Sequence, residues 1–283
     1  MSFNPLSAYK AELQIAEFNR ISEFINQNFG IKLPDHKRIM LQGRLLNRLV
    51  KLNFDNFKEY TDYVFSEHGK IQEQQHMIDA ISTNKTDFFR ESVHFDYLRE
   101  TVFPEIIEKK LIKPINIWST ACSSGEEAYT IAMVAQDYFG KFSKYDFNIL
   151  ATDISIRMLE KAKTAIYPIQ LTMPIPLETK KKYLLKSKDP NKAEVRIIKM
   201  LRDKISFEWH NLIDKEYKFQ REFDIIFCRN VLIYFSKKDQ LHVLNNLTKK
   251  LKSGGYLFLG HSESIAQFDL PLQSVSQTVY KKI

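Results

Sequence analysis

The sequence predicts an α/β protein in which a mainly parallel sheet follows a small, all-helical N-terminal domain and is interrupted by an inserted subdomain. Three observations support this fold class. Apolar residues recur at three- and four-residue intervals through the first 80 positions, β-rich and helical segments alternate after Pro114, and the interval 166–204 is too long for a simple crossover connection. At 283 residues, the chain is long enough for two domains.

The composition is that of a globular protein. With 44% hydrophobic and 13% aromatic residues against 27% charged, the chain can bury a sizeable core. Its longest apolar runs have five residues, far below the roughly 20 that span a membrane, and its first residues do not resemble a secretory signal. We therefore expect a cytoplasmic protein. Cys122 and Cys228 are too few for a disulfide framework or a multi-cysteine metal site, and no metal is expected.

The excess positive charge lies in one stretch of the chain. The 42 Lys and Arg residues against 34 Asp and Glu give a net charge of +8. Residues 1–80 hold ten of each sign, whereas residues 157–204 hold thirteen basic and five acidic residues, a difference of +8. Such a stretch is either a solvated surface or a site for nucleic acid, an anionic membrane or an acidic protein.

Residues 1–80 are expected to form the helical domain. Apolar side chains over 15–29 follow the period of an amphipathic helix, and a second helix is expected over 36–52 with Asp35 as its cap. Two more helices are expected over 57–65 and 71–81. Four basic side chains of the second helix fall within roughly 60° of one another. This basic stripe consists of Lys37, Arg44, Arg48 and Lys51.

Five β-rich segments are expected as strands of the sheet domain, residues 114–283. They are residues 115–119, 147–152, 205–210, 223–228 and 256–260. Helical segments, including 126–139 and 237–251, lie between them. This alternation implies a parallel sheet with helices on both faces, and such sheets bind ligands beyond the carboxyl ends of their strands.

The turn after the first strand, STACSSGEE at 119–127, is suited to the close approach of a ligand because its side chains are small. A dinucleotide fingerprint would need three glycines, and only Gly125 is present. Glu126 and Glu127 lie where a phosphate would bind and would repel it. The turn therefore favours a ligand that is cationic or rich in hydroxyls, although glutamate at a helix start is also a common complement to the helix dipole.

Asp153 ends the second strand, 28 residues beyond Gly125. An acidic residue at this strand end is placed to accept hydrogen bonds from two ribose hydroxyls. Together with the turn, it favours a nucleoside without phosphates, and S-adenosylmethionine is the common ligand of that description. The alternative is that Asp153 caps a helix starting at Ile154.

The fourth strand leads into the segment CRNVLIY at 228–234. Methyltransferases that act on amino groups often carry an Asp/Asn-Pro-Pro-aromatic turn at this place. The two prolines are absent here, which favours an acceptor other than an amine. The alternative role for Tyr234 is that of a half-buried core aromatic.

The segment STNKTDFFR at 82–90 precedes the sheet. If a helix begins at Asp87, Thr86 and Arg90 are one turn apart, Phe88 and Phe89 anchor the segment, and Arg90 can point at an anion. The alternative is a capped linker helix with a solvated arginine. We expect residues 81–113 to form a linker helix that contributes to the active site.

Taken together, these blocks resemble the CheR family, the chemotaxis receptor protein-glutamate O-methyltransferases. The matching blocks are TNKTDFFR (83–90), WSTACSSGEEAYTIA (118–132), ATDIS (151–155), FCRNVLIYF (227–235) and GGYLFLGHSES (254–264), and LPDHKR (33–38) is similar to the family's N-terminal domain. The likeness covers nearly the whole chain in order. It implies a Rossmann-like methyltransferase fold that transfers methyl from S-adenosylmethionine to receptor glutamates, giving methyl esters for sensory adaptation and S-adenosylhomocysteine as product.

The resemblance also implies roles for individual residues. Those that would border the S-adenosylmethionine pocket are Asn84, Thr86, Arg90, Glu127, Asp153, Asn211, Leu212, Arg229 and Asn230. Asn211 and Leu212 would lie on the adenine side. Arg90 and Tyr234 would face the substrate glutamate as catalytic residues.

The partner implied by the resemblance is the cytoplasmic helical domain of a methyl-accepting chemotaxis receptor, bound by a monomer. The residues that would dock it are Lys37, Arg38, Arg44, Arg48 and Lys51. The family's basic helix often has more arginines, whereas Gly43, Asn47 and Val50 interrupt it here. Receptor-tethered members also carry a glycine-rich loop in the inserted subdomain. Residues 186–194 contain no glycine, so binding of a receptor's C-terminal tail there stays open.

Two other functions stay open at this point. The basic stretch is compatible with an RNA methyltransferase, but the chain has no obvious RNA-binding module, and no nucleic acid is expected. An adaptor that binds the cofactor without turnover would need a broken pocket, whereas Asn84, Arg90, Glu127, Asp153 and Tyr234 are all present.

Overall fold

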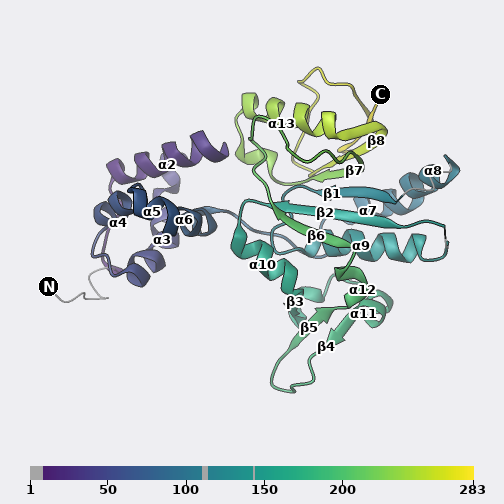
Figure 1. Cartoon of the computed structure of the whole chain (residues 1–283), viewed down its shortest axis with the longest axis horizontal. Coiled ribbons are helices and arrows are strands. Elements are labelled where there is room, and N and C mark those ends of the chain that lie inside the picture. The colour runs from purple at the N-terminus through teal and green to yellow at the C-terminus, as the bar shows by residue number, and fades with distance from the viewer. Residues whose placement is uncertain (1–8, 110–113, 143) are drawn as a thin grey trace. The chain divides into compact units, whose positions relative to one another are not determined.

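A computed structural model describes residues 9–109, 114–142 and 144–283 of the chain (Figure 1). Its contacts divide the chain into two compact units. The first contains the residues up to Thr83 together with Ile154–Ile156 and Tyr234–Asp239, and the second contains Asn84–Asp153, Arg157–Ile233 and Gln240–Ile283. Residues 110–113, the end of the expected linker helix, lie outside the described residues.

The first unit is built from helices, as the apolar periodicity predicts. They are α2 (Ile15–Phe29), the 3-10 turn η1 (Asp35–Lys37), α3 (Arg38–Leu52), α4 (Phe57–Val64), α5 (Glu67–Gln72) and α6 (Gln74–Ile81). Two expectations were wrong in detail. Asp35 lies inside η1, so Lys37 and not Asp35 is the residue before α3. The helix expected over 71–81 is divided at Glu73, whose backbone leaves the helical region at φ −127°.

The core of this unit comes from one face of each amphipathic helix. Phe18, Ile21, Ile25 and Phe29 of α2 are buried at the predicted three- and four-residue spacing. From α3 it is Leu41, Leu45 and Leu49 that are buried, one turn apart. Gly30 ends α2 in the left-handed region, with φ 69°, and its N–H caps the carbonyl oxygen of Asn26.

Two arginines of the basic stripe bind other residues of the same unit. Arg48 forms a bidentate ion pair with Glu73, with N–O distances of 2.8 and 2.5 Å. The hydroxyl of Tyr60 donates to the same carboxylate at 3.0 Å. The side chain of Glu73 is 1% exposed. The hydrogen bond to Glu73 raises the pKa of Arg48. The pKa of Tyr60 is also raised, mainly by burial and in second place by the negative charge of Glu73. Arg44 donates to the carbonyl oxygens of Ile81 and Ser82.

The second unit contains a seven-stranded sheet in the order β6-β2-β1-β7-β8-β10-β9. Its strands are β1 (Ile115–Ser119), β2 (Phe147–Asp153), β6 (Ile205–Trp209), β7 (Phe223–Cys228), β8 (Leu251–Leu259), β9 (Leu272–Ser276) and β10 (Val279–Lys282). The first five match the strands that the sequence predicts and pair in parallel, whereas β10 is antiparallel to β8. β9 and β10 were not predicted, because β9 is largely exposed and lacks an apolar pattern.

Helical segments accompany the sheet in the order that the alternation predicts. They are α7 (Val93–Tyr97), the π-helical turn η2 (Leu98–Val102), α8 (Phe103–Glu108), α9 (Glu126–Phe139), α10 (Ile156–Thr164), η4 (Leu232–Tyr234) and α13 (Lys237–Lys250). Three aromatic rings fix α7 on the sheet: Phe95 stacks on Phe227 at 6.0 Å, and Phe227 stacks on Phe258 at 4.5 Å. None of the helices among the described residues is long and apolar enough to span a bilayer.

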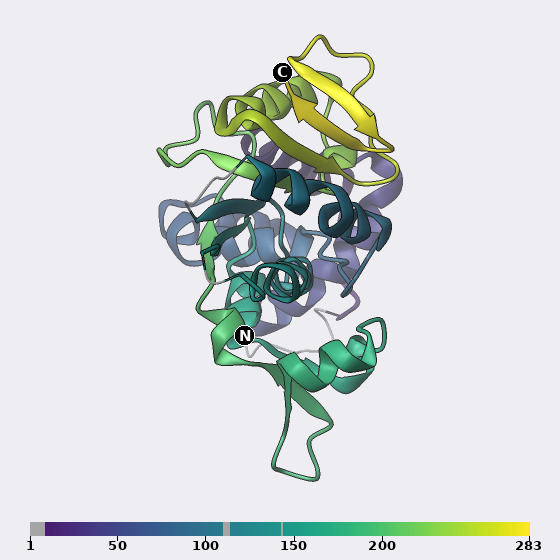
Figure 2. The same ribbon diagram turned by 90° about the vertical axis from the view of Figure 1, so that its right-hand side faces the viewer.

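The inserted subdomain that the long interval predicts is a second, smaller sheet in the order β3-β5-β4 (Figures 1 and 2). Its elements are β3 (Ile166–Pro168), η3 (Ile169–Thr172), α11 (Leu177–Tyr183), β4 (Leu184–Lys186), β5 (Glu194–Ile197) and α12 (Lys199–Arg202). Figure 2 shows the hairpin of β4 and β5 projecting from the rest of the second unit. Neighbouring carboxylates pair with several of the lysines in the basic stretch: Lys181 with Glu178, Lys182 with Asp137, Lys199 with Asp203, and Lys204 with Asp146.

We expect the Arg48 ion pair to stabilise the helical unit. Arg48→Met would leave the buried carboxylate of Glu73 without its cation and should lower the free energy of unfolding by about 2 to 3 kcal/mol. The matched control is Arg20→Met, because Arg20 pairs with Asp62 while both side chains stay about half exposed; it should cost less than about 1 kcal/mol. Urea denaturation measures both, and equal losses would contradict a structural role for the buried pair.

Candidate active site

The candidate site lies at the carboxyl ends of the central strands of the sheet. From β1 the chain winds outward to β2 and then β6, and it later returns to the other side of β1 to form β7 and β8. The winding direction therefore reverses between β1 and β7. Open α/β sheets bind their ligands at such a reversal, outside the carboxyl ends of the strands.

The turn after β1 is joined to the end of β2. The backbone N–H of Ser123 donates to Asp153 Oδ2 at 2.8 Å. Asp153, the residue predicted to bind the ribose, therefore lies beside the turn that is predicted to approach the ligand closely. Gly125 adopts φ 97°, and a Cβ there would lie 2.9 Å from the Cβ of Ala162 and 3.0 Å from the hydroxyl of Tyr167. Both the backbone conformation and the close packing therefore require glycine at this position.

Glu127 connects β1 to β7 and does more than complement the dipole of α9. Ser119 Oγ donates to its Oε1 at 2.6 Å, and Arg229 Nη1 donates to its Oε2 at 3.2 Å. The side chain is 15% exposed. Burial raises the pKa of the Glu127 carboxyl, and the charge of Arg229 opposes that rise. The carboxylate is thus held at the reversal point by Ser119, the last residue of β1, and by Arg229, which directly follows β7.

Arg229 is the buried cation of the site, with a side chain 1% exposed. Besides Glu127, its guanidinium reaches Glu91 Oε2 at 3.1 Å and donates to the carbonyl oxygen of Arg90. It also lies over the ring of Phe95, 5.5 Å from the centroid. One side chain therefore connects α9, the end of β7 and the segment that precedes α7.

Glu91 is held in the left-handed region, at φ 56°. Its second carboxylate oxygen accepts from Asn230 Nδ2 at 3.1 Å. Burial favours the neutral acid, but the hydrogen bond from Asn230 and the charge of Arg229 prevail and lower the pKa of the Glu91 carboxyl. Glu91 is therefore an ionised partner of Arg229, and it fixes Asn230 relative to the segment 83–92.

Glu263 fixes the turn that follows β7. Its carboxylate accepts four backbone N–H groups, those of Asn230 at 2.9 Å, Val231 at 2.9 Å, Leu232 at 2.8 Å and Gly260 at 2.7 Å. Asn230 itself is left-handed, at φ 58°. Burial raises the pKa of the Glu263 carboxyl, and the backbone hydrogen bonds oppose the rise. The buried carboxylate thus supplies the hydrogen-bond acceptors that regular secondary structure would otherwise provide for the backbone N–H groups of this turn.

The segment 83–92 is irregular, so the helix expected from Asp87 was wrong. The first helix after Thr83 begins at Val93, because Phe89 and Glu91 have φ values of 53° and 56°, which a right-handed helix cannot contain. Phe88 and Phe89 do anchor the segment, as expected. Phe88 is buried 5.0 Å from the ring of Tyr167, and Phe89 packs 5.7 Å from Phe95.

The predicted site residues of this segment lie beside the turn after β1. The carbonyl oxygen of Asn84 accepts from Ser123 Oγ at 3.0 Å. Thr86 is half-buried, and without a helix it is not one helical turn from Arg90. The backbone of Arg90 is held by Arg229, whereas its guanidinium closes the turn on the carbonyl oxygen of Lys85 at 3.0 Å.

Asn211 and Leu212 follow β6, next to the end of β2. In the sheet register Asp153 is paired with Trp209, so both residues lie just beyond the level of Asp153. Both are buried. Asn211 Oδ1 accepts from the N–H of Ile213, and this bond shapes the turn.

The other predicted residues belong to the first unit. Tyr234 ends η4, is half-buried, and its carbonyl oxygen accepts from the N–H of Lys32 at 3.1 Å. Arg90 belongs to the second unit, so the two residues assigned to the substrate fall in different units. Arg38 donates to the carbonyl oxygen of Leu13. Lys51 is exposed and Lys37 is half-buried.

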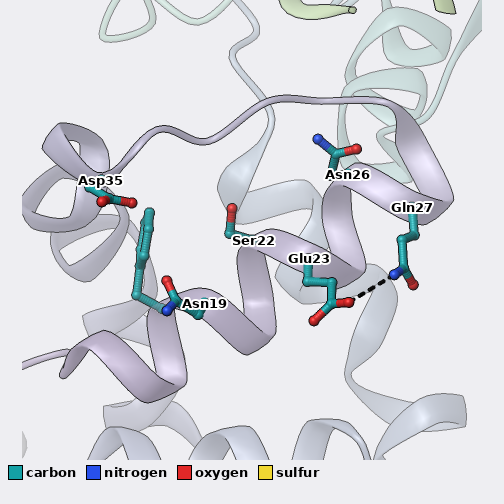
Figure 3. A pocket seen from close by; sticks show the side chains of 7 residues that line it. Asn19, Ser22, Glu23, Asn26, Gln27 and Asp35 are labelled. Carbon is teal, nitrogen blue, oxygen red and sulfur yellow. Dashed lines mark hydrogen bonds between the residues drawn. The ribbon is translucent and has the colours of Figure 1, made fainter.

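A pocket of the first unit contains none of the predicted residues (Figure 3). One face of α2 and Asp35 form it, and its lining consists of Phe18, Asn19, Ser22, Glu23, Asn26, Gln27 and Asp35. Gln27 Nε2 donates to Glu23 Oε1, one turn away on the helix surface, at 2.9 Å. The charged side chains that line the pocket are those of Glu23 and Asp35, and their charge is opposite in sign to that of the basic stripe.

Sequence reasoning missed two residues of the site, Glu91 and Glu263. Glu91 directly follows the block 83–90, and Glu263 lies inside the block 254–264. Both blocks were recognised, but their acidic residues bind backbone or side-chain groups far away in the sequence. An acid next to a site arginine, or one following a strand end, is the signal that could have identified them.

The donor set of the second unit suits S-adenosylmethionine. Asp153 offers carboxylate oxygens to a ribose, the glycine turn allows close approach, and the acidic groups at the start of α9 favour a cationic ligand over a phosphate. The buried guanidinium of Arg229 does not reverse this preference, because it is matched by Glu127 and Glu91.

Comparison with known proteins decides the family. Residues 84–281 match the domain described as "CheR methyltransferase, SAM binding domain", and residues 16–82 match the "CheR methyltransferase, all-alpha domain". The chain belongs to the CheR methyltransferase family. It is a methyltransferase that uses S-adenosylmethionine, and the family, fold class and cofactor predicted from the sequence are confirmed.

Curated members of the CheR family resemble the chain over most of its length. The chemotaxis protein methyltransferase of Borreliella burgdorferi is 41% identical over 271 residues, which cover 94% of each chain. The chemotaxis protein methyltransferase of Salmonella typhimurium is 36% identical, over 95% of this chain and 90% of its own. That of Escherichia coli is 35% identical, over 95% and 91%.

We expect Gly260 to be essential to the turn after β7. A Cβ at this position would lie 2.5 Å from Asn230 Nδ2 and 2.9 Å from both Asn230 N and Glu263 Oε2. Gly260→Ala should therefore displace Asn230, lower the free energy of unfolding by about 1 to 3 kcal/mol, and weaken S-adenosylmethionine binding about tenfold or more.

Gly43→Ala is the matched control, because a Cβ there meets nothing within 4 Å. Gly43 lies inside α3, so alanine should preserve or raise stability by up to about 1 kcal/mol and leave cofactor affinity unchanged. Calorimetry with S-adenosylmethionine and urea denaturation test both variants. Parental affinity in Gly260→Ala would show that the turn does not shape the cofactor site.

Proposed function

We propose that this chain transfers the methyl group of S-adenosylmethionine to glutamate side chains of chemotaxis receptors in the cytoplasm, giving glutamate methyl esters. The observation that supports the proposal most strongly is the family match over both domains, together with relatives named chemotaxis protein methyltransferase that align with nearly the whole chain. A carboxylate acceptor also agrees with the lack of a proline-containing amine-binding turn after β7.

The reaction needs alignment more than acid–base chemistry. S-adenosylmethionine supplies an electrophilic methyl group on a sulfonium when it is bound. A glutamate side chain has a pKa of about 4.3 and is already ionised at neutral pH, so the protein need not remove a proton. Placing the acceptor oxygen in line with the methyl and sulfur can contribute roughly 7 to 11 kcal/mol. Loss of the carboxylate charge in the product changes repulsion between receptor helices.

In this proposal Asp153 binds the ribose hydroxyls and Glu127 favours the cationic end of the cofactor. Asn84, Thr86, Asn211, Leu212, Arg229 and Asn230 complete the pocket. Arg229 acts mainly through its neighbours, because its guanidinium is buried and bound to Glu127 and Glu91. It keeps the carboxylate of Glu127 and the backbone of Arg90 at fixed places.

Arg90 is the residue we assign to the acceptor carboxylate, with Tyr234 as its second contact. Its backbone is immobilised by Arg229, while its guanidinium has an exposed hydrogen bond to the carbonyl oxygen of Lys85. Exchange of that bond for a substrate carboxylate costs little, since both are made at the surface. A single hydrogen bond to one carboxylate oxygen leaves the other oxygen free to attack.

We further propose that a monomer docks the receptor's helical domain through the basic residues of the first unit. Lys37 and Lys51 are the stripe residues best suited to this role, since Arg48 is committed to Glu73 and Arg44 to the carbonyl oxygens after α6. Positive charge at longer range would then come from Arg38, Arg44 and Arg48. The acidic partner surface that such a stripe selects would set the rate of association more than the affinity.

Binding of a receptor's C-terminal tail at the inserted subdomain is a separate part of the proposal. β4 lies at the edge of the three-stranded sheet, where an extended peptide can add a strand. An RNA substrate is less well supported. Several lysines of the basic stretch are paired with carboxylates, which reduces the charge available to phosphates.

The assay that tests the proposal follows labelled methyl from S-adenosylmethionine to receptor-bearing membranes or to RNA. We expect label on receptor, released as methanol by mild base because it is a carboxyl ester. Arg90→Ala should lower the single-turnover rate at saturating cofactor, and Arg90→Lys should restore only part of it, because an ammonium lacks the planar fork of a guanidinium.

Arg99→Ala is the matched control, since Arg99 is half exposed in the same unit and pairs with Asp96; it should methylate receptor at the parental rate. Base-stable label, or label on RNA alone, would overturn the proposed acceptor. A parental single-turnover rate in Arg90→Ala would remove Arg90 from the positioning role while leaving the acceptor assignment intact.

A further inference from the structure

Three side chains with metal-binding atoms meet beside the site, at the edge that Arg229 and Glu91 share. They are Glu91, His94 in α7, and His261 after β8, and one ligand atom of each lies within 4.8 Å of the others. His94 Nδ1 is 3.7 Å from Glu91 Oε2, and His261 Nε2 is 3.9 Å from the same oxygen. The cluster joins segments about 170 positions apart in the sequence.

The hydrogen bonds around His94 decide which of its nitrogens carries the proton. Thr278 Oγ1 lies 2.9 Å from His94 Nε2, and it donates its single proton to the carbonyl oxygen of Gln277 at 2.8 Å. The hydroxyl must therefore accept from His94, so the proton is on Nε2 and Nδ1 has a lone pair. A second group that holds the outer nitrogen in this way is typical of metal-binding histidines.

That lone pair faces a carboxylate. His94 is 1% exposed, and its Nδ1 has no hydrogen-bond partner among the described residues. Nδ1 faces Glu91 Oε2 across 3.7 Å. Glu91 Oε2 already accepts from Arg229 Nη2 at 3.1 Å and from the backbone N–H of His261 at 3.3 Å, so Nδ1 is the acceptor that lacks a partner among the described residues. A cation bound between the two atoms would supply that partner.

We propose that Glu91, His94 and His261 form a binding site for a divalent transition-metal ion of the Zn²⁺ class. Two imidazole nitrogens and one carboxylate are ligands that such ions prefer. Around a tetrahedral ion with bonds near 2.1 Å, ligand atoms lie about 3.4 Å apart. The 3.7 and 3.9 Å separations from Glu91 therefore need to close by only a few tenths of an ångström, while the ligand atoms of the two histidines, which lie within 4.8 Å of each other, need a rotation of the His261 ring. His261 is 43% exposed, so its ring can turn and water can fill the fourth position.

The local charge balance allows a cation despite the nearby guanidinium. Arg229 is shared by two carboxylates, Glu91 and Glu127, so the group of three carries a net negative charge when both acids are ionised. The ion would share Glu91 Oε2 with Arg229, which links occupancy of the metal site to the segment that holds Arg90. No local sequence pattern indicates this site, and the expectation of no metal rested on the two cysteines alone.

The test is titration of Zn²⁺ alone into the purified, metal-free full-length chain by calorimetry. We expect one ion per chain, with an affinity weakened about tenfold or more in His261→Ala and in Glu91→Gln. His261→Ala is the cleaner variant because the side chain is exposed and its loss leaves Arg229 paired. The matched control is His36→Ala, an exposed histidine of the first unit, which should bind the ion as the parent does.

A second readout identifies the ligands. Co²⁺ bound at the site should give the visible bands of a tetrahedral nitrogen and oxygen site, without thiolate charge transfer. Failure of the parent to bind one Zn²⁺, unchanged affinity in His261→Ala, or a thiolate band from Cys122 or Cys228 would each overturn the inference. None of these results depends on the receptor or on methyl transfer, so failure here leaves the proposed function untouched.

Discussion

The second unit depends on one buried cation held between two carboxylates. The side chain of Arg229 is almost entirely excluded from water, and a desolvated guanidinium is stable only where nearby carboxylates balance its charge. Nη1 and Nη2 each pair with a carboxylate, whereas Nε has no hydrogen-bond partner among the described residues. Glu127 supplies one partner from the start of α9 and Glu91 supplies the other from the segment before α7. Because both carboxylates must reach the same side chain, the ends of β1 and β7, the first turn of α9 and the Arg90 backbone have little freedom to move independently.

This constraint explains why irregular backbone is tolerated at the site. Glu91 and Asn230 both have positive φ, which costs free energy in non-glycine residues, and each is held by a buried carboxylate contact. Glu263 supplies four acceptor bonds to the turn after β7, and Gly260 leaves the space in which those bonds form. The turns of the candidate cofactor site are thus fixed by side chains from distant segments.

The sequence predicts the regular elements better than these turns. Short β-rich runs indicated the five parallel strands, of which β7 is buried on both faces. Apolar residues three and four positions apart indicated helices of the first unit, because burial of one helix face leaves a local signature. Asp153 and Glu127 could be predicted as site residues because a strand end and a helix start are local features too. Glu91, Glu263 and the histidines bind partners 138 or more positions away, or across sheet strands, which no local period encodes. The same holds for Arg48, predicted as a docking residue from one helix face but paired with Glu73 of the neighbouring segment.

A double-mutant cycle between Arg229 and Glu91 tests the central claim most directly, with the free energy of unfolding and S-adenosylmethionine affinity as readouts. Arg229→Met alone should destabilise strongly, by about 3 kcal/mol or more, because it leaves two buried carboxylates without a cation. Glu91→Gln added to that variant should cost little further or restore stability, giving a coupling energy of about 1 to 3 kcal/mol, and cofactor affinity should follow the same pattern. Effects that add within about 0.5 kcal/mol would contradict the account, since the two residues would then act independently.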